Sequence, residues 1–290
     1  MSSTISKPKY ADVLKDIDSF YTLHALQALC PTTNTTLKVK PLSVEQLKGF
    51  IEMQVRTEKD EFGVIPGLAA VQQLNEVIVN NCLSDDTKDN LLESLTVIDR
   101  DAVLLQMRET VNSELELVVD EENTESVDLS EIVARLKESK FPAKAKTKNS
   151  TIKFGTGSIK IKLSLPSLQT DFLINNYFKA KVTQKLQKGK KQLKKDIDKI
   201  LGQVYLAEIS KYIVSIVITK GENETYITFS DSATLDDNLA LLEKLPSVVV
   251  SEATKFVSDV KKYRDSIFYY INSDDKQIPL QIDIALFAGI

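Results

Sequence analysis

The sequence contains no tryptophan and a single histidine, His24, in 290 residues. A catalytic triad or dyad that depends on histidine could therefore be built only on this residue. His24 follows Leu23 and precedes Cys30, in a segment with a strand pattern. Since general acid–base catalysis needs a placed partner and none is signalled here, we interpret His24 as a partly buried or edge residue. No catalytic residue is predicted.

Cysteine and glycine are also scarce, with two and nine residues. Cys30 and Cys82 are too few and too far apart for a disulfide framework or a metal cluster, so we expect reduced thiols in a cytosolic setting. Neither the GxGxxG string nor the GxxxxGK[ST] string occurs, which argues against a phosphate-binding loop. The sequence thus predicts no cofactor and no metal, and it favours a protein that is not an enzyme. An enzyme of unrecognised type remains the least favoured interpretation.

Long apolar runs are absent as well. The longest, such as 213–218 and 248–250, fall far short of the ~20 residues that a membrane-spanning helix needs. No charged and then apolar leader precedes Tyr10. With a net charge of −4, the chain has no overall attraction for nucleic acid or for an anionic membrane. These features predict a soluble chain without a membrane partner, in which any electrostatic function is local.

What the sequence does contain is a succession of short strands and amphipathic helices. Residues 21–40 predict a strand pair around turn-forming residues at 31–34. Ser43 is then expected to cap a helix, with Gln46 as its capping-box partner. The apolar face predicted for this helix consists of Val44, Leu47, Ile51 and Val55.

The remainder of residues 1–140 extends this strand pair into a small helical bundle. Helical spacing covers 68–79, then 85–95 and a third segment that Asp99 is expected to cap. The acidic pairs at the starts of the last two helices, Asp85/Asp86 and Asp99/Asp101, are interpreted as charges at helix N-termini. Residues 114–119 alternate like a strand, whereas 127–132 fit a strand or a helix equally well.

Residues 141–150 lose all periodicity and are expected to form a linker or long loop. A second lobe, 151–290, follows. It is predicted to hold a hairpin turning at 155–157, helices, a second hairpin and a strand-like C-terminus. The predicted fold class is therefore α+β: an N-terminal hairpin and helical bundle, then a hairpin-and-helix lobe. The elements expected after the first hairpin are helices at 168–178 and 186–204, a hairpin at 213–229, helices at 235–245 and 246–263, and a strand at 278–287. The first arm of the second hairpin, 213–219, also fits the end of the long helix.

Two charge clusters are candidate binding surfaces or solvated faces. The segment 114–131 holds eight acidic residues and no basic one, and 179–199 holds nine lysines against two aspartates. A lysine-rich helix at 179–199 could bind nucleic acid, and a nucleic-acid-binding module is the alternative function. The segment lacks arginine and has few aromatics nearby, which favours a solvated face or a protein contact. An acidic and a basic segment in one chain also permit self-association through unlike surfaces.

The order of four short segments is similar to a known family. These segments are KVKPLSVEQLKGFIEMQ at 38–54, LTVIDRDAVLLQMRETV at 95–111, KLPSVVV at 244–250 and IPLQIDIALF at 278–287. Together they resemble the T4-like bacteriophage baseplate proteins, the family of the baseplate hub subunit and the hub assembly catalyst. Many members carry paired cysteines before the terminal strand, suggesting a zinc-binding hairpin. Here 269–274 contains no cysteine, so the resemblance implies no metal, and the tyrosines are expected to pack in its place.

The resemblance implies a non-enzymatic tail protein that is part of the baseplate hub or assists its assembly. Its implied partners are other phage baseplate or tail proteins, and its implied location is the virion and, during assembly, the host cytoplasm. Apolar terminal strands offer edges to a neighbouring chain. The residues predicted to contact partners are Leu280, Ile282, Ile284, Leu286 and Phe287, together with the basic face Lys190, Lys191, Lys194 and Lys195. Since apolar strands are more often buried than exposed, a core role for the terminal apolar residues is an equal alternative.

Overall fold

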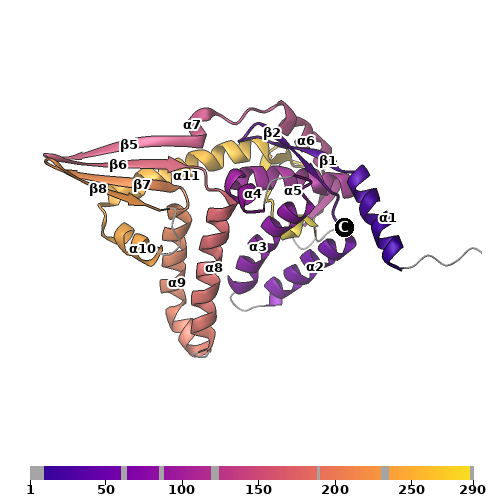
Figure 1. Ribbon diagram of the computed structural model, residues 1–290, viewed down its shortest axis with the longest axis horizontal. Helices are drawn as coiled ribbons and strands as arrows, with labels where there is room; N and C mark the ends of the chain where they lie inside the picture. Colours follow the sequence, from indigo (N-terminus) through magenta and orange to yellow (C-terminus); the bar gives the residue numbers. More distant parts are fainter. Residues whose placement is uncertain are drawn as a thin grey trace, which may run out of the picture.

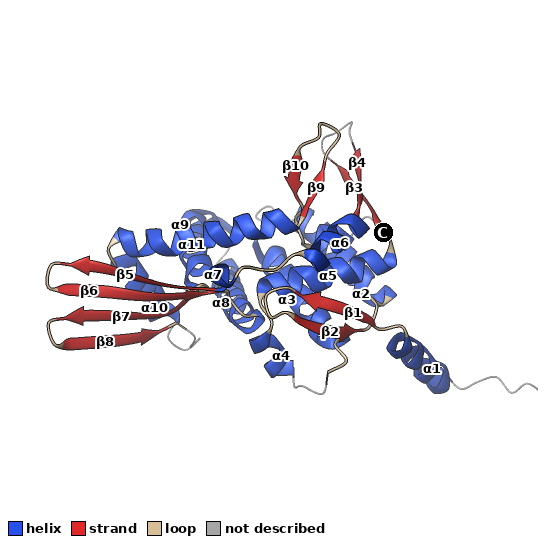
Figure 2. Ribbon diagram, turned by 90° about the horizontal axis from the view of Figure 1, so that it is seen from above, coloured by secondary structure: helices blue, strands red, loops and turns tan. Residues whose placement is uncertain are grey.

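The computed structural model of the protein describes residues 10–59, 64–84, 88–118, 124–187, 190–229 and 235–287. Helices and small antiparallel sheets alternate along the chain, which confirms the α+β class (Figures 1 and 2). The first half contains α1 (Tyr10–Leu23), β1 (Leu26–Cys30), β2 (Thr35–Val39), α2 (Val44–Lys59), α3 (Val64–Asn81), α4 (Lys88–Ser94), α5 (Val97–Val111), β3 (Glu114–Val118), β4 (Thr124–Asp128) and α6 (Leu129–Glu138).

The second half contains a larger sheet and long helices. Its elements are α7 (Ala143–Lys146), β5 (Thr147–Phe154), β6 (Gly157–Ser164), α8 (Leu168–Gln187), α9 (Lys190–Ser210), β7 (Ile213–Lys220), β8 (Asn223–Thr228), α10 (Leu235–Lys244), α11 (Ser247–Ile267), β9 (Tyr269–Ile271), β10 (Gln277–Pro279) and the 3₁₀ helix η2 (Ile284–Phe287).

The four-stranded antiparallel sheet has the strand order β5-β6-β7-β8, so β5 and β8 are its edges. Period-two alternation buries Ile159, Ile161 and Leu163 of β6 and leaves Lys160 and Lys162 exposed on the opposite face. Helix α11 packs on the buried face against β5 and β6. The strands' hairpin turns form one end of the molecule (Figure 2). At the β5–β6 turn, Gly155 has φ 53°, a left-handed conformation that glycine adopts without strain.

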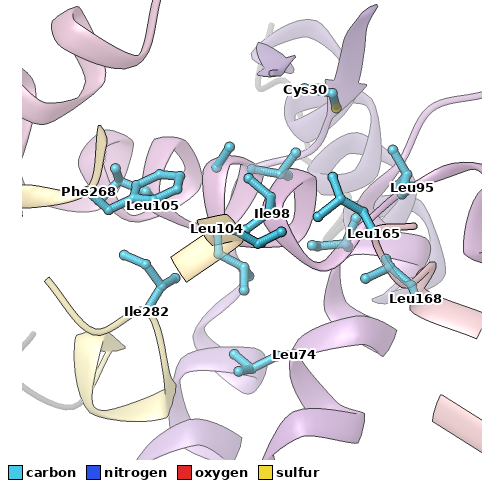
Figure 3. Close-up of a cluster of buried hydrophobic side chains, with 14 of the residues drawn as sticks. Cys30, Leu74, Leu95, Ile98, Leu104, Leu105, Leu165, Leu168, Phe268 and Ile282 are labelled. Carbon is cyan, nitrogen blue, oxygen red and sulfur yellow. The ribbon is translucent and has the colours of Figure 1, made fainter. Parts of the chain in front are cut away.

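Helix α5 lies at the centre of the fold. Every residue from Ile98 to Met107, apart from Arg100, is fully buried, and so is Arg108. Its start is fixed by a capping box in which the Thr96 hydroxyl accepts from the Asp99 amide and the Asp99 carboxylate accepts from the Thr96 amide. Thr96 is thus the N-cap, and the prediction that Asp99 fills this position is wrong by three residues. Figure 3 shows side chains from both halves of the chain that pack around this helix.

The segment after α11 returns to the first half of the chain and closes its core. Phe287 in η2 stacks on Phe50 of α2 with ring centroids 4.5 Å apart. The buried guanidinium of Arg108 donates to the carbonyl oxygens of Leu286, Asn112 and Glu114, which ties η2 to the end of α5. The two halves of the chain therefore share one hydrophobic core.

Several predicted boundaries need correction. The expected linker at 141–150 holds α7 and the first half of β5. Ala145 of α7 is buried, and Lys148 and Ser150 of β5 face α11, where they bond Glu252. The strand expected at 278–287 ends at Pro279 and is followed by η2. The single helix expected at 186–204 is divided between α8 and α9. Residues 127–132, where the pattern fitted a strand or a helix, are divided between the end of β4 and the start of α6, with Asp128 as the N-cap of α6.

The N-terminal hairpin and the helix after it are confirmed in part. β1 pairs with β2, and Ser43 and Gln46 exchange the two capping-box hydrogen bonds. Leu23 belongs to α1 instead of the first strand. The apolar face predicted for α2 is wrong, since Val44, Ile51 and Val55 are exposed and Phe50 is the buried anchor. The core lies on the Phe50 side because η2, which is distant in sequence, packs there.

The packing of η2 generates a prediction about stability. Phe287→Ala should lower the free energy of unfolding by about 3–5 kcal/mol, because it removes a fully buried ring and leaves a cavity beside Phe50. Leu23→Ala is the control: Leu23 is 83% exposed, and its loss should change stability by no more than about 0.5 kcal/mol. Urea denaturation followed by circular dichroism measures both. Equal stability of the two variants would contradict the burial of Phe287.

Candidate functional site

Charged side chains meet at the junction between the two halves of the chain. The junction cluster is defined as Asn75 of α3, Arg100 and Asp101 of α5, Asp171 of α8, Lys211 after α9, and Arg264 of α11. These residues come from five different parts of the chain. Each residue belongs to α5 or to an element that packs close to α5. The fold therefore brings these side chains together.

Asp171 is the centre of the junction cluster. One carboxylate oxygen accepts from Lys211 Nζ at 2.6 Å, and the other accepts from Arg100 Nη1 at 3.0 Å and Asn75 Nδ2 at 3.4 Å. Asp101 lies next to it and accepts from Arg100 Nε at 3.2 Å and Arg264 Nε at 2.9 Å. Both carboxylates are thus held by two cations each.

The ion pairs of Asp171 and Lys211 determine the protonation states of these two side chains. Burial alone would raise the pKa of the Asp171 carboxyl, but Lys211 and Arg100 lower it below its usual value. Burial would likewise lower the pKa of Lys211, and Asp171 and Glu208 raise it instead. Asp171 and Lys211 are therefore both ionised at neutral pH. A carboxylate stabilised in this way is a weak proton acceptor, which makes it a poor general base.

A cavity of ≈ 340 Å³ adjoins the junction cluster. Tyr212 lines it, and burial raises the pKa of this phenol to about 12, so the hydroxyl stays neutral. Asn175 also lines the cavity, and its Nδ2 is buried without a hydrogen-bond partner among the described residues. No nucleophile with an adjacent base lies in this cavity within the described part of the chain. The geometry is that of an ionic junction between packed helices.

The residues examined for catalysis lie elsewhere. His24 is exposed in the turn after α1, outside any strand, and its ring lies 4.2 Å from that of Phe20. Burial raises the pKa of the Cys30 thiol to about 12, so it is not a reactive thiolate. Asp99 belongs to a capping box, as its position near a helix start suggested, whereas Asp101 belongs to the junction cluster. Asp85 and Asp86 lie outside the described residues.

The apolar residues predicted to contact partners are core residues. Leu280, Ile282, Ile284, Leu286 and Phe287 are all at most 7% exposed. The prediction that they form an edge open to another chain is wrong, and the alternative that they are core is confirmed, because η2 packs on α2 and Arg108 of α5 donates to Leu286. The sequence of 278–287 by itself does not distinguish an apolar strand that is buried from one whose edge is exposed.

The lysine-rich segment forms parts of two helices instead of one. Lys185 of α8 pairs with Asp196 of α9 at 2.7 Å, and Lys181 of α8 pairs with Asp236 of α10 at 3.1 Å. Some of its charge is therefore used within the fold. Lys190, Lys191, Lys194 and Lys195 open α9, but their side chains lie outside the described residues, so their predicted role stays a prediction.

Residues 269–279, where the tyrosines were expected to pack, form the hairpin of β9 and β10. Arg135 of α6 lies over the Tyr269 ring, 3.5 Å from its centroid, and donates to the Tyr269 carbonyl. The turn of the hairpin bonds Glu125 of β4 through Ser273. The tyrosine packing expected at this position is thus confirmed.

Exposed strand edges are the remaining candidate site. In the part of the chain that the structure describes, no strand pairs with the outer edge of β5 or of β8. The face of the sheet opposite α11 presents exposed side chains, among them Asn149, Thr151, Lys160, Lys162 and Tyr226. An exposed edge of this kind can pair with an extended segment of another chain.

Among the described residues, no group of histidine, cysteine, aspartate and glutamate side chains could hold a metal ion. None of the described helices has the length and apolar character needed to cross a bilayer. The chain matches no protein-family model, no curated protein and no solved structure with which it was compared. The function is therefore inferred from the geometry of the chain itself.

The junction cluster generates a prediction about pH dependence. Asp171→Asn should lower the free energy of unfolding at pH 7 by about 3–5 kcal/mol, because it leaves Lys211 and Arg100 buried with less compensating charge. The pKa of Asp171 is lower in the folded chain than the ~3.9 of an unfolded aspartate, so its contribution is complete above about pH 5. It is lost as the pH falls through the folded pKa.

The measurement is urea denaturation of wild type and variant between pH 3 and 8. The stability difference should be constant at neutral pH and should shrink below about pH 4. Glu243→Gln, at an exposed position of α10, is the matched control and should show no such difference. A difference between wild type and Asp171→Asn that persists unchanged at pH 3 would contradict an ionised Asp171.

Proposed function

We propose that this chain is a non-enzymatic protein of a bacteriophage tail, working in the baseplate hub or in its assembly through contacts with other proteins. The observation that carries the proposal is the four-stranded sheet, which forms one end of the molecule with both edge strands unpaired among the described residues. Such a sheet is a surface for binding another chain.

The chemistry of the described side chains supports a binding role. The charged groups of the junction cluster are engaged with one another, and the lone histidine lies outside it on the surface. The segments that resemble the baseplate family also supply the main packing anchors: Phe50 in the first of them, the buried helix α5 in the second and Phe287 in the last.

A rigid body suits this function. Assembly of a hub requires surfaces whose position does not change between encounters, since ordering a flexible segment costs binding free energy. The junction cluster and the return of the C-terminal segment hold the two halves together, so the sheet has a fixed position relative to the helical part. Nucleic-acid binding by 179–199 has less support, because part of that charge is used in internal pairs.

The test is to follow the chain in infected host cells. Antibody detection after density-gradient separation should find it with other tail proteins, in finished particles, in assembly intermediates or in both. An infection in which its production is blocked should yield incomplete tails. Recovery of the chain only as a free protein, with normal tails formed in its absence, would contradict the proposal.

A further inference from the structure

The sheet's edge strand β5 lies in a stretch of unusual charge. From Ser139 to Thr170 the chain contains seven lysines and no aspartate or glutamate, although the whole chain has a net charge of −4. This stretch forms α7, β5 and β6. The free edge of the sheet is therefore also its most basic part, and an acidic partner is favoured there.

A groove of ≈ 570 Å³ lies at the start of β5, between α7 and α11. Its apolar part is formed by Phe256, which is buried, and by Tyr263, which is 38% exposed. Three lysines, Lys144, Lys148 and Lys262, line it together with Asp259. The groove thus combines an aromatic surface with basic side chains.

Two of these lysines have charge available for a partner. Lys148 is engaged by Glu252 at 3.3 Å. Lys262 has only a 4.0 Å contact with Asp259, and both side chains are well exposed. Lys144 is exposed and has no ion pair among the described residues. Exposed cations beside an apolar surface favour a ligand that brings carboxylates and an apolar group together.

We propose that the outer edge of β5 binds an extended acidic segment of a partner protein, which adds to the sheet as a fifth strand. In a strand, successive side chains point to opposite faces. One set of the partner's side chains would lie over Phe256 and Tyr263 between the groove lysines. The other set would lie on the face that carries Lys153, Lys160 and Lys162. This inference rests on the proposed function and names the chemistry of the partner.

The probe is a fluorescein-labelled peptide, acetyl-Glu-Val-Glu-Phe-Glu-Val-Glu-amide, titrated with the full chain and followed by fluorescence anisotropy. We expect saturable binding that weakens as salt rises, because ion pairs on a surface are screened. The peptide with every glutamate replaced by lysine should not bind. Failure of the acidic peptide to bind at low salt would overturn the proposal.

Charge-reversal variants locate the site. Lys144→Glu combined with Lys262→Glu should weaken peptide binding at least about tenfold, since both changes replace attraction by repulsion. Lys261→Glu combined with Lys276→Glu makes the same change in net charge at exposed positions that do not line the groove, and should leave the affinity within about twofold. Equal effects of the two double variants would show that the peptide responds only to net charge, and would overturn the proposal.

Backbone methylation tests strand addition itself. Peptides methylated on alternate amide nitrogens block hydrogen bonds on one edge of the peptide or the other. One of the two methylated peptides should lose binding and the other should retain it. Equal binding of both would overturn the fifth-strand geometry.

Two further outcomes would overturn an acidic protein segment as the occupant of the site and would identify another occupant. Tighter binding of a fluorescein-labelled 15-mer of deoxythymidine, lost in the groove variant, would identify the site as one for nucleic acid. Sedimentation of the full chain as a dimer that the groove variant disrupts would identify a second copy as the occupant. If the peptide fails but the chain is found with tail proteins in infected cells, this inference falls and the proposed function stands.

Discussion

The constraint on which the structure depends is the nearly complete burial of α5. A buried polar group without a partner costs several kcal/mol, so each polar side chain on this helix must bond to whatever packs against it. Asp99 accepts from Thr32 at the β1–β2 turn, Gln106 bonds the backbone of Leu29, Asp101 binds Arg264 of α11, and Arg108 binds the carbonyl of Leu286. Each contact holds a different element in place around the helix.

This arrangement explains why the two halves of the chain form one body. Arg100 reaches α8 through Asp171, and Lys211 extends the same ionic cluster to the end of α9. Apolar packing is tolerant of small shifts, whereas paired and buried charges are satisfied in few geometries. The cluster therefore fixes how the helices of the second half sit on α5. The sheet that they carry is fixed with them.

The ionisable side chains that would be candidates for catalysis are engaged in the contacts that hold the fold together. Asp171 is held ionised by Lys211 and Arg100, and Asp101 is paired with Arg100 and Arg264. Cys30 is held protonated by burial, and Arg108 donates to backbone carbonyls. The polar face of the sheet and its edges stay available on the described surface. The proposed binding function, which the resemblance to assembly proteins implies, would use that surface. In the proposal, the lysines around β5 attract an acidic partner.

The sequence by itself determined the local elements. The alternation around Gly155 defined the β5–β6 hairpin, and Ser43 with Gln46 defined the start of α2, because each depends on neighbours within a few residues. Only the tertiary structure decided which apolar and charged residues are buried. The sequence left Ile282 and Phe287 open between an exposed edge and the core, and the structure buries both. Asp171 lies in a segment for which the sequence predicted only a helix, and the structure makes it the centre of an ionic cluster. Their partners lie from 40 to more than 200 residues away in the chain, and local periodicity carries no information about such distances.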